Sequence, residues 1–267
     1  MFRFEAHDAV ARFRARCSGF FEGADILENA IDVAFNWRPA DNSDNVAVVL
    51  FFLARRCVED FREIALLASN GYGWGATAHL RGMYERAVVT AYLHNHPEQV
   101  NKFIDYDLVR RWRAAQKIKE TFKEDPEDAE KLVALRRDYD AIVEQFRVTD
   151  CAKCQTTRIN HSWNKLDFVS MAASVGTLGR AVVPAYYMPL GQAHATLASA
   201  VYQLSESSDG GFIVDQERNE AEILRSFKFG HLIVLSVLDV HHEHFRLAAL
   251  SEPLANAWQH YKSAWNY

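Results

Sequence analysis

Apolar residues recur every three or four positions along most of the chain, which places them on one face of an α-helix. The spacing predicts helices over 6–21, 25–37, 45–68 and about 216–250, and a final aromatic-rich helix that begins at Pro253. No run of strictly alternating apolar and polar residues predicts a sheet. The pattern therefore predicts an all-α fold, a multi-helix bundle of roughly nine to eleven helices around one core.

Helix breakers and membrane signals are both scarce. The chain has twelve Gly and six Pro in 267 residues, and few breakers over this length favour long helices. Hydrophobic residues make up 49% of it, enough for a large core, yet no apolar run has the length of a membrane span. The N-terminus lacks the basic and apolar regions of a signal peptide. We therefore expect a soluble, cytoplasmic protein with no membrane partner.

The most charged part of the chain is the segment 98–148, which the pattern divides into two helices. The first helix carries a basic cluster made of Arg110, Arg111, Arg113 and Lys117. Because the formal net charge of the chain is −5, a general nucleic-acid-binding surface is not expected, and only a local basic groove stays open. We expect one all-helical domain, 1–267, with 98–148 as a charged helical hairpin appended to it.

An apolar helix over 80–93 carries Arg81 and Glu85 one turn apart. Residues at i and i+4 share a helix face, so these side chains can pair with each other or act on one ligand. Two interpretations stay open, since charges inside a core-like helix need partners. The pair is either a structural ion pair or a carboxylate, held by Arg81, that orients a histidine or binds a polar ligand. Tyr84 lies on a neighbouring face and would widen such a site.

A histidine on a helix of small residues is the second candidate. His194 follows Tyr187 by seven residues and lies among Gly, Ala and Thr, which let a helix or a ligand come close. Such a histidine is more often a satisfied core residue. If Glu85 accepts one ring N–H of His194, the other ring nitrogen is oriented for acid–base chemistry or ligand binding. Trp163, in a polar loop, is expected to anchor that loop to the core.

Two patterns contain residues that bind metals. Cys151-x-x-Cys154 with a histidine nearby supplies three zinc-type ligands, but the fourth is missing. Asp239, His242 and Glu243 share a helix face, yet no facing Glu-x-x-His repeat completes a di-metal site. A solvated polar face is the better interpretation of these three residues. We expect no metal site and no cofactor.

The pair Arg225 and His231 resembles the loose Arg-x(4–6)-His signature of HEPN-type helical ribonucleases. The resemblance implies that His231 acts as an acid–base and that Arg225 holds the phosphate attacked by a 2′-hydroxyl. Six residues of helix separate two side chains by roughly 120°, so one regular helix does not place them on one face. The resemblance nevertheless keeps one alternative function open, a metal-independent ribonuclease of a toxin or phage-defence system with RNA as its partner.

Three segments together resemble an uncharacterised bacterial family of all-helical proteins, a domain of unknown function. They are the helix from Arg81 to Leu93, the segment His161-Ser162-Trp163-Asn164-Lys165, and the stretch from Tyr187 to His194, and the resemblance spans about 47–203. It implies that Arg81, Glu85, Trp163, Tyr187 and His194 belong to one shared centre. Distant similarity to HEPN-like helical domains keeps the ribonuclease alternative open.

These patterns leave three functions and the question of enzymatic activity open. The first hypothesis is a polar ligand-binding centre of Arg81, Glu85 and His194 that takes an unknown small molecule or protein. The alternatives are the ribonuclease and a metal-dependent helical-bundle enzyme. The aromatic C-terminal segment, which contains Trp258 and Trp265, is a candidate homodimer interface.

Overall fold

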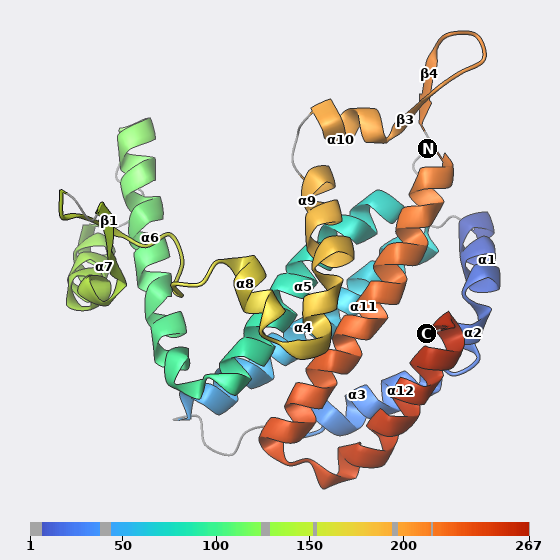
Figure 1. Cartoon of the computed structure of the whole chain (residues 1–267), viewed down its shortest axis with the longest axis horizontal. Coiled ribbons are helices and arrows are strands. Elements are labelled where there is room, and N and C mark those ends of the chain that lie inside the picture. The colour runs from blue at the N-terminus through green and yellow to red at the C-terminus, as the bar shows by residue number, and fades with distance from the viewer. Residues whose placement is uncertain are drawn as a thin grey trace. The chain divides into compact units, whose positions relative to one another are not determined.

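The computed structural model describes residues 7–37, 44–123, 129–151, 154–193, 197–214 and 216–266. Within these ranges almost every element is helical (Figure 1), which confirms the predicted all-α fold. The exceptions are two short antiparallel hairpins. None of the described helices combines the length and the apolar composition that crossing a bilayer requires.

The chain divides into two compact units. The first comprises residues 1–95 and 169–267, and the second comprises residues 96–168. The second unit contains the segment 98–148 that we expected as a charged hairpin, together with the loop that follows it. The organisation as a single domain stays a prediction.

Three long helices form the centre of the first unit, namely α4 (Asn45–Ser69), α5 (Gly73–Asn95) and α11 (Gln216–Phe245). They pack against one another side by side (Figure 1). The other helical elements are α1 (His7–Arg16), α2 (Ser18–Phe21), α3 (Ala24–Phe35), α8 (Phe168–Ala173), the 3₁₀ helix η3 (Gly176–Ala181), the π-helix η4 (Val183–Tyr187), α9 (Met188–Ala193), α10 (Leu197–Tyr202), the 3₁₀ helix η5 (Ala248–Leu250) and α12 (Ser251–Trp265). Strands β3 (Leu204–Glu206) and β4 (Phe212–Val214) pair antiparallel.

Helix α5 packs against both α4 and α11, and most of its circumference is buried. Leu80, Met83 and Val88 are among its fully buried side chains. A helix that is apolar on nearly all sides is stable only when other elements enclose it. Gly73 lets the start of α5 approach α11 closely, because a Cβ at this position would lie 2.2 Å from the Asn219 carbonyl oxygen.

Two histidines of α11 are buried among aromatic rings. His231 is 0% exposed, packs edge-on against Phe20, and accepts a hydrogen bond at Nδ1 from the indole N–H of Trp265 at 3.1 Å. His241 is 1% exposed, and its Nε2 lies 2.9 Å from the Ala34 carbonyl oxygen. Burial lowers the pKa of His231 to about 3 and that of His241 to about 4. Both imidazoles are therefore neutral at pH 7.

The second unit is built on the predicted pair of helices. The 3₁₀ turn η1 (Pro97–Gln99) leads into α6 (Val100–Phe122), which packs against α7 (Ala129–Ile142). The rings of Trp112 and Tyr139 stack between the two helices, with centroids 5.6 Å apart. This packing agrees with the charged hairpin that the sequence predicts.

The chain leaves the helical conformation earlier than the sequence led us to expect. We expected the second helix of the hairpin to reach about residue 148, but α7 ends at Ile142 and the 3₁₀ helix η2 (Val143–Phe146) follows it. Strands β1 (Arg147–Cys151) and β2 (Thr156–Ile159) then form an antiparallel hairpin in which Thr149 pairs with Thr157. β-Branched residues favour this extended pairing over helix.

The two buried histidines predict a loss of stability in acid. The unfolded chain takes up protons as the pH falls below about 6.5, whereas His231 and His241 in the folded chain do not until about pH 3 and 4. Each histidine therefore lowers the free energy of unfolding by about 1.4 kcal/mol per pH unit below about pH 6.5. The raised pKa of Asp239 acts in the opposite direction between about pH 6 and pH 4.

Comparing variants separates these opposing contributions. We expect His231→Asn, whose amide oxygen can still accept the Trp265 N–H, to have a shallower decline in stability between about pH 6.5 and pH 4.5. Urea unfolding at a series of pH values measures the decline. His96→Asn, at an exposed turn, is the control and should follow the wild type. Equal slopes for all three proteins would contradict a buried, neutral His231.

Candidate functional site

The pair Arg81 and Glu85 forms the expected contact on α5. Arg81 Nε donates to Glu85 Oε1 at 2.9 Å, and the guanidinium lies over the Tyr186 ring with Cζ 5.1 Å from the centroid. The side chains are 23% and 41% exposed, so the pair is more open to solvent than the sequence led us to expect. Tyr186 belongs to the π-helix η4, a type of turn that is frequent at functional sites.

The other members of the predicted centre lie in different surroundings. Tyr84 is 0% exposed and donates its hydroxyl to the Leu178 carbonyl at 2.8 Å, and burial raises its pKa, so its role here is to join α5 to η3. Tyr187 is 48% exposed. Trp163 belongs to the second unit, where it is buried and packs edge-on against Phe103. His194 lies outside the described residues, so its place in the centre stays a prediction.

The structure gives no support to the ribonuclease alternative, which stays a prediction. Arg225 forms an ion pair with the fully buried Glu222, which also accepts the Thr77 hydroxyl at 2.9 Å. His231 is enclosed in the aromatic core with its pKa lowered by burial to about 3. An imidazole without solvent access cannot act as the acid–base for an RNA backbone.

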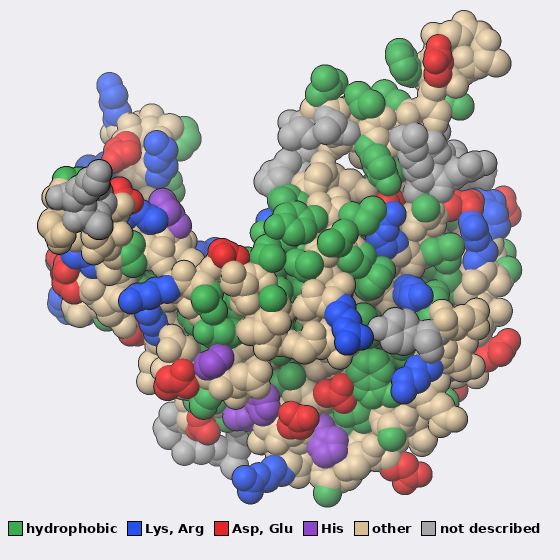
Figure 2. Space-filling model, in the orientation of Figure 1, with side chains coloured by type: hydrophobic (Ala, Val, Ile, Leu, Met, Phe, Trp, Pro, Cys, Tyr) green, Lys and Arg blue, Asp and Glu red, His purple; other side chains and the backbone are tan. Residues whose placement is uncertain are grey.

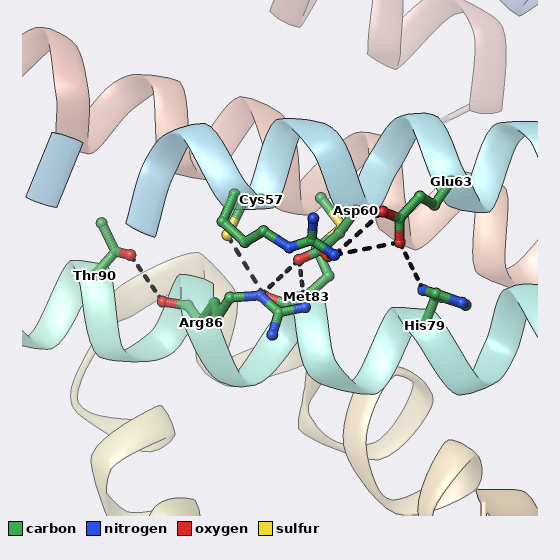
Figure 3. A network of polar contacts seen from close by, with 8 residues as sticks. Cys57, Asp60, Glu63, His79, Met83, Arg86 and Thr90 are labelled. Atoms are coloured by element: carbon green, nitrogen blue, oxygen red, sulfur yellow. Dashed lines mark hydrogen bonds and ion pairs between the residues drawn. The ribbon is translucent and has the colours of Figure 1, made fainter. Parts of the chain in front are cut away.

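A buried carboxylate that sequence reasoning missed connects α4 with α5. Asp60 is 0% exposed, and Arg86 donates to its Oδ2 from Nε at 2.6 Å (Figure 3). Arg56 approaches Oδ1 at 3.1 Å and also contacts Glu63 at 3.2 Å. Burial raises the pKa of Asp60, and the guanidinium of Arg86 partly offsets this effect. The sequence signal was an acid among the apolar positions of α4, in the pattern Cys-Val-Glu-Asp-Phe.

A cleft of about 300 Å³ lies where α5, η3 and α11 meet. Its polar lining includes His94 from the end of α5, Thr177 from η3, and Asp239 and Glu243 from α11. Figure 2 shows histidine and acidic side chains gathered at the lower end of the first unit, where α5 and α11 end. The walls also contain apolar side chains from all three elements, Ala91, Val175, Leu178 and Val240.

Asp239 is the most strongly perturbed acid of this cleft. Burial raises its pKa to about 6, and the nearby Glu243 adds to the rise. The Trp258 indole N–H lies 3.0 Å from each carboxylate oxygen of Asp239, which partly offsets the rise. No Lys or Arg side chain of the described residues forms an ion pair with Asp239. The carboxylate therefore stays anionic at pH 7 but is unusually ready to take a proton.

His94 supplies an imidazole on the opposite side of the cleft. Its Nε2 lies 3.4 Å from Glu243 Oε2, and its Nδ1 lies 3.5 Å from His244 Nδ1. Burial lowers the pKa of His244, and the neighbouring His94 adds to this shift. The cleft can thus accept hydrogen bonds from a ligand at the carboxylates of Asp239 and Glu243, and it offers the imidazole of His94 as a further hydrogen-bonding group.

The predicted solvated polar face of α11 holds for Glu243, whose side chain is 71% exposed, whereas Asp239 is more enclosed than that interpretation implies. Asp239 is half-buried and lines the cleft with Glu243, whereas His242 leaves it and contacts the Ser251 hydroxyl at 2.9 Å. Within the described part of the chain, no three His, Cys, Asp or Glu side chains are placed to hold a metal ion. Cys154 is exposed, and its Sγ lies 3.3 Å from the Thr156 hydroxyl oxygen. The side chain of Cys151 lies outside the described residues.

Comparison with known proteins gives one match. The model of a family of unknown function, DUF5677, matches residues 47–212 of the chain. The chain belongs to this family. The match confirms the resemblance to a domain of unknown function, while a bacterial origin and a HEPN-like character stay predictions. No curated protein and no solved structure gives a significant match.

The matched range divides the candidate residues into two groups. Arg81, Glu85 and Tyr187 lie inside the region that defines membership of DUF5677, as does the α5 side of the cleft. Asp239 and Glu243, on α11, lie beyond residue 212. The carboxylates of the cleft are therefore observed in this chain and are not part of the family match.

The network in Figure 3 predicts that the two arginines bound to Asp60 differ in their effect on stability. Arg86→Met leaves a fully buried carboxylate without its closest partner and should lower the free energy of unfolding by about 2–3 kcal/mol. Arg56 is 49% exposed, so Arg56→Met should cost about 0–1 kcal/mol. Adding Asp60→Asn to Arg86→Met should recover part of the loss.

Denaturant unfolding of the four proteins measures these differences. The Arg56→Met variant is a matched control because it removes a guanidinium from the same carboxylate at the solvent side. Equal losses for the Arg56 and Arg86 variants would contradict the assignment of Arg86 as the buried partner.

Proposed function

We propose that the chain binds a small cationic ligand, such as an aliphatic amine, in the cleft between α5, η3 and α11. One observation carries the proposal. The fully buried acids of the first unit, Asp60 and Glu222, each have an arginine partner. Within the described residues Asp239 has no arginine or lysine partner, and its neighbours are the Trp258 indole N–H and, less closely coupled, His242. A partly desolvated carboxylate without a cation is the arrangement that an added cation stabilises.

The charge of the lining favours a cation over an anion. Asp239 and Glu243 are the acids that line the cleft, and its lining contains no Lys or Arg. His94 is the basic group there, and it lies close to Glu243. At neutral pH the potential inside the cleft is therefore negative, which attracts positive ligands and repels anions.

The size and walls of the cleft favour a small ligand with an aliphatic part. A volume of about 300 Å³ is at the lower end of the range for small-molecule sites. Apolar side chains line it on several sides, so methylene groups of a ligand would gain from burial there. Ser236 already donates its hydroxyl to the Leu232 carbonyl at 2.9 Å, so it can only accept a hydrogen bond from a ligand.

The centre of Arg81, Glu85 and His194 stays a separate prediction. The described pair is satisfied within α5 and against Tyr186, which agrees with its interpretation as a structural ion pair. The cleft between α5, η3 and α11 combines an open volume, an acid with a raised pKa and a neighbouring imidazole, and these three features are typical of a ligand-binding site.

Butylamine, butyrate and butanol test which ligand charge the cleft prefers, because they share an aliphatic chain and are positive, negative and neutral at about pH 7.5. We expect butylamine to bind with a Kd on the order of 1 mM at about pH 7.5, and butyrate and butanol to bind far more weakly. Asp239→Asn keeps an acceptor for Trp258 and should weaken butylamine binding about tenfold. NMR titration of the full chain measures these affinities.

The pH dependence follows from the direction of the Asp239 shift. Because its pKa is raised to about 6, binding of the amine should weaken as the pH falls through that value, when the carboxylate takes up a proton. Glu252→Gln, on α12 outside the cleft, is the charge-matched control and should bind like the wild type. Tighter binding of butyrate than of butylamine would contradict the proposal.

A further inference from the structure

The second unit has a cleft of its own, of about 510 Å³, between α6 and the loop that follows β2. Tyr106, Asp107, Arg110, Arg111 and Arg113 line it from α6, and His161 lines it from the loop. All of these residues belong to the second unit, so the cleft is complete within residues 96–168. Three guanidinium groups and one imidazole face one space that contains a single carboxylate.

Arg113 connects the α6 side of this basic cleft to the loop that follows β2. Its guanidinium donates to the Tyr106 hydroxyl at 3.1 Å and to the carbonyl oxygens of Ile159 and Asn160 at 2.9 and 3.0 Å. These three bonds tie the loop to α6 and use three of the five N–H donors of Arg113. The Arg113 guanidinium therefore stabilises the fold of this unit. By holding the Asn160 backbone, it also fixes the position of His161, which follows Asn160 in the chain.

The loop that presents His161 is also held from within. The Asn160 side chain donates to the Asn164 carbonyl at 2.8 Å and accepts the backbone N–H of His161 at 2.9 Å. Trp163 is 8% exposed and packs against Phe103 of α6. The side of the cleft that carries His161 is therefore preorganised before any ligand binds.

Arg110 and Arg111 differ from the other arginines of this unit. Both side chains are exposed, and neither forms an ion pair or a hydrogen bond with a described residue. Four other arginines of the unit are each paired with a carboxylate, as Arg136–Asp140, Arg137–Asp138, Arg147–Glu144 and Arg158–Asp150. Both arginines line the same cleft, so an anion bound there would be attracted by two guanidinium charges that no described carboxylate pairs with.

We propose that this cleft binds a phosphate group through Arg110, Arg111 and His161. Each guanidinium offers a planar fork that binds two oxygens of one anion, and the imidazole supplies a third donor from the facing loop. Inorganic phosphate or a phosphate monoester has enough terminal oxygens to contact both forks and the ring at once, whereas a carboxylate has two oxygens, and a nucleic-acid strand would instead contact these groups through successive phosphodiesters. The phosphate belongs either to a small molecule or to the backbone of a single-stranded nucleic acid.

Titration of the full chain with inorganic phosphate, acetate and a single-stranded octauridylate tests the assignment and separates the two sources. We expect inorganic phosphate to bind the wild type more tightly than acetate. Arg110→Gln and Arg111→Gln should each weaken phosphate binding about tenfold, the loss expected for one charge-assisted contact. Lys131→Gln, an exposed lysine of α7 outside the cleft, removes the same charge and should bind like the wild type.

Binding of inorganic phosphate that depends on both arginines supports a small-molecule source, and binding of the octauridylate alone with the same dependence supports a nucleic-acid source. Equal weakening by Lys131→Gln, equal affinity for acetate, or no binding of either phosphate compound would overturn the proposal. Both arginines are exposed, and thermal unfolding of each variant verifies that the fold is retained.

Discussion

The structure depends on how the three long helices of the first unit satisfy the acids that they remove from water. Asp60 between α4 and α5 and Glu222 on α11 are both fully buried, and each is bound by an arginine. A buried carboxylate without such a partner costs several kcal/mol, so these pairs are a condition for close packing of the helices. Asp239 is the exception, since an indole N–H is its hydrogen-bond partner within the described residues. Burial raises its pKa to about 6, and no arginine of the described residues offsets that rise.

This contrast separates polar groups that are bound within the fold from polar groups that can still bind a ligand. The arginines of Asp60 and Glu222, the hydroxyl of Tyr84 and the guanidinium of Arg113 are all held by partners within the fold. Functional groups must instead have capacity left for a ligand. The same criterion selects Asp239 in the first unit and the two exposed arginines of α6 in the second. Membership of DUF5677 assigns no activity, so both proposals rest on the chemistry of this chain.

Local patterns in the sequence were enough to predict the fold class and some contacts. The helical spacing predicted α4 and α5, and the pair Arg81 and Glu85 was expected because residues at i and i+4 share a face. The N-terminal cap of α4 is equally local, since Asp44 accepts the backbone N–H groups of Val46 and Ala47. Each of these features depends on residues within a few positions of one another.

The cleft and the buried acids could not be predicted in the same way. His94 and Asp239 are about 145 positions apart in the sequence, and only the packing of α5 against α11 brings them to one cavity. The partner of Asp60 was equally hidden, because Arg86 reaches it from the next helix. An acid at an apolar position of a helix was the available signal, and it does not distinguish a structural pair from a site. The partner of that acid decides between the two, and because it comes from another helix it is a property of the folded chain.

The pKa of Asp239 is the most direct measure of an available acid in the cleft. A pH titration of the side-chain carboxyl carbon by NMR, in the free chain and with butylamine, reports it. The account predicts a pKa of about 6 in the free chain, lowered when the amine is present, because a bound cation favours the carboxylate. An ordinary value near 3.8 that the amine does not move would contradict it.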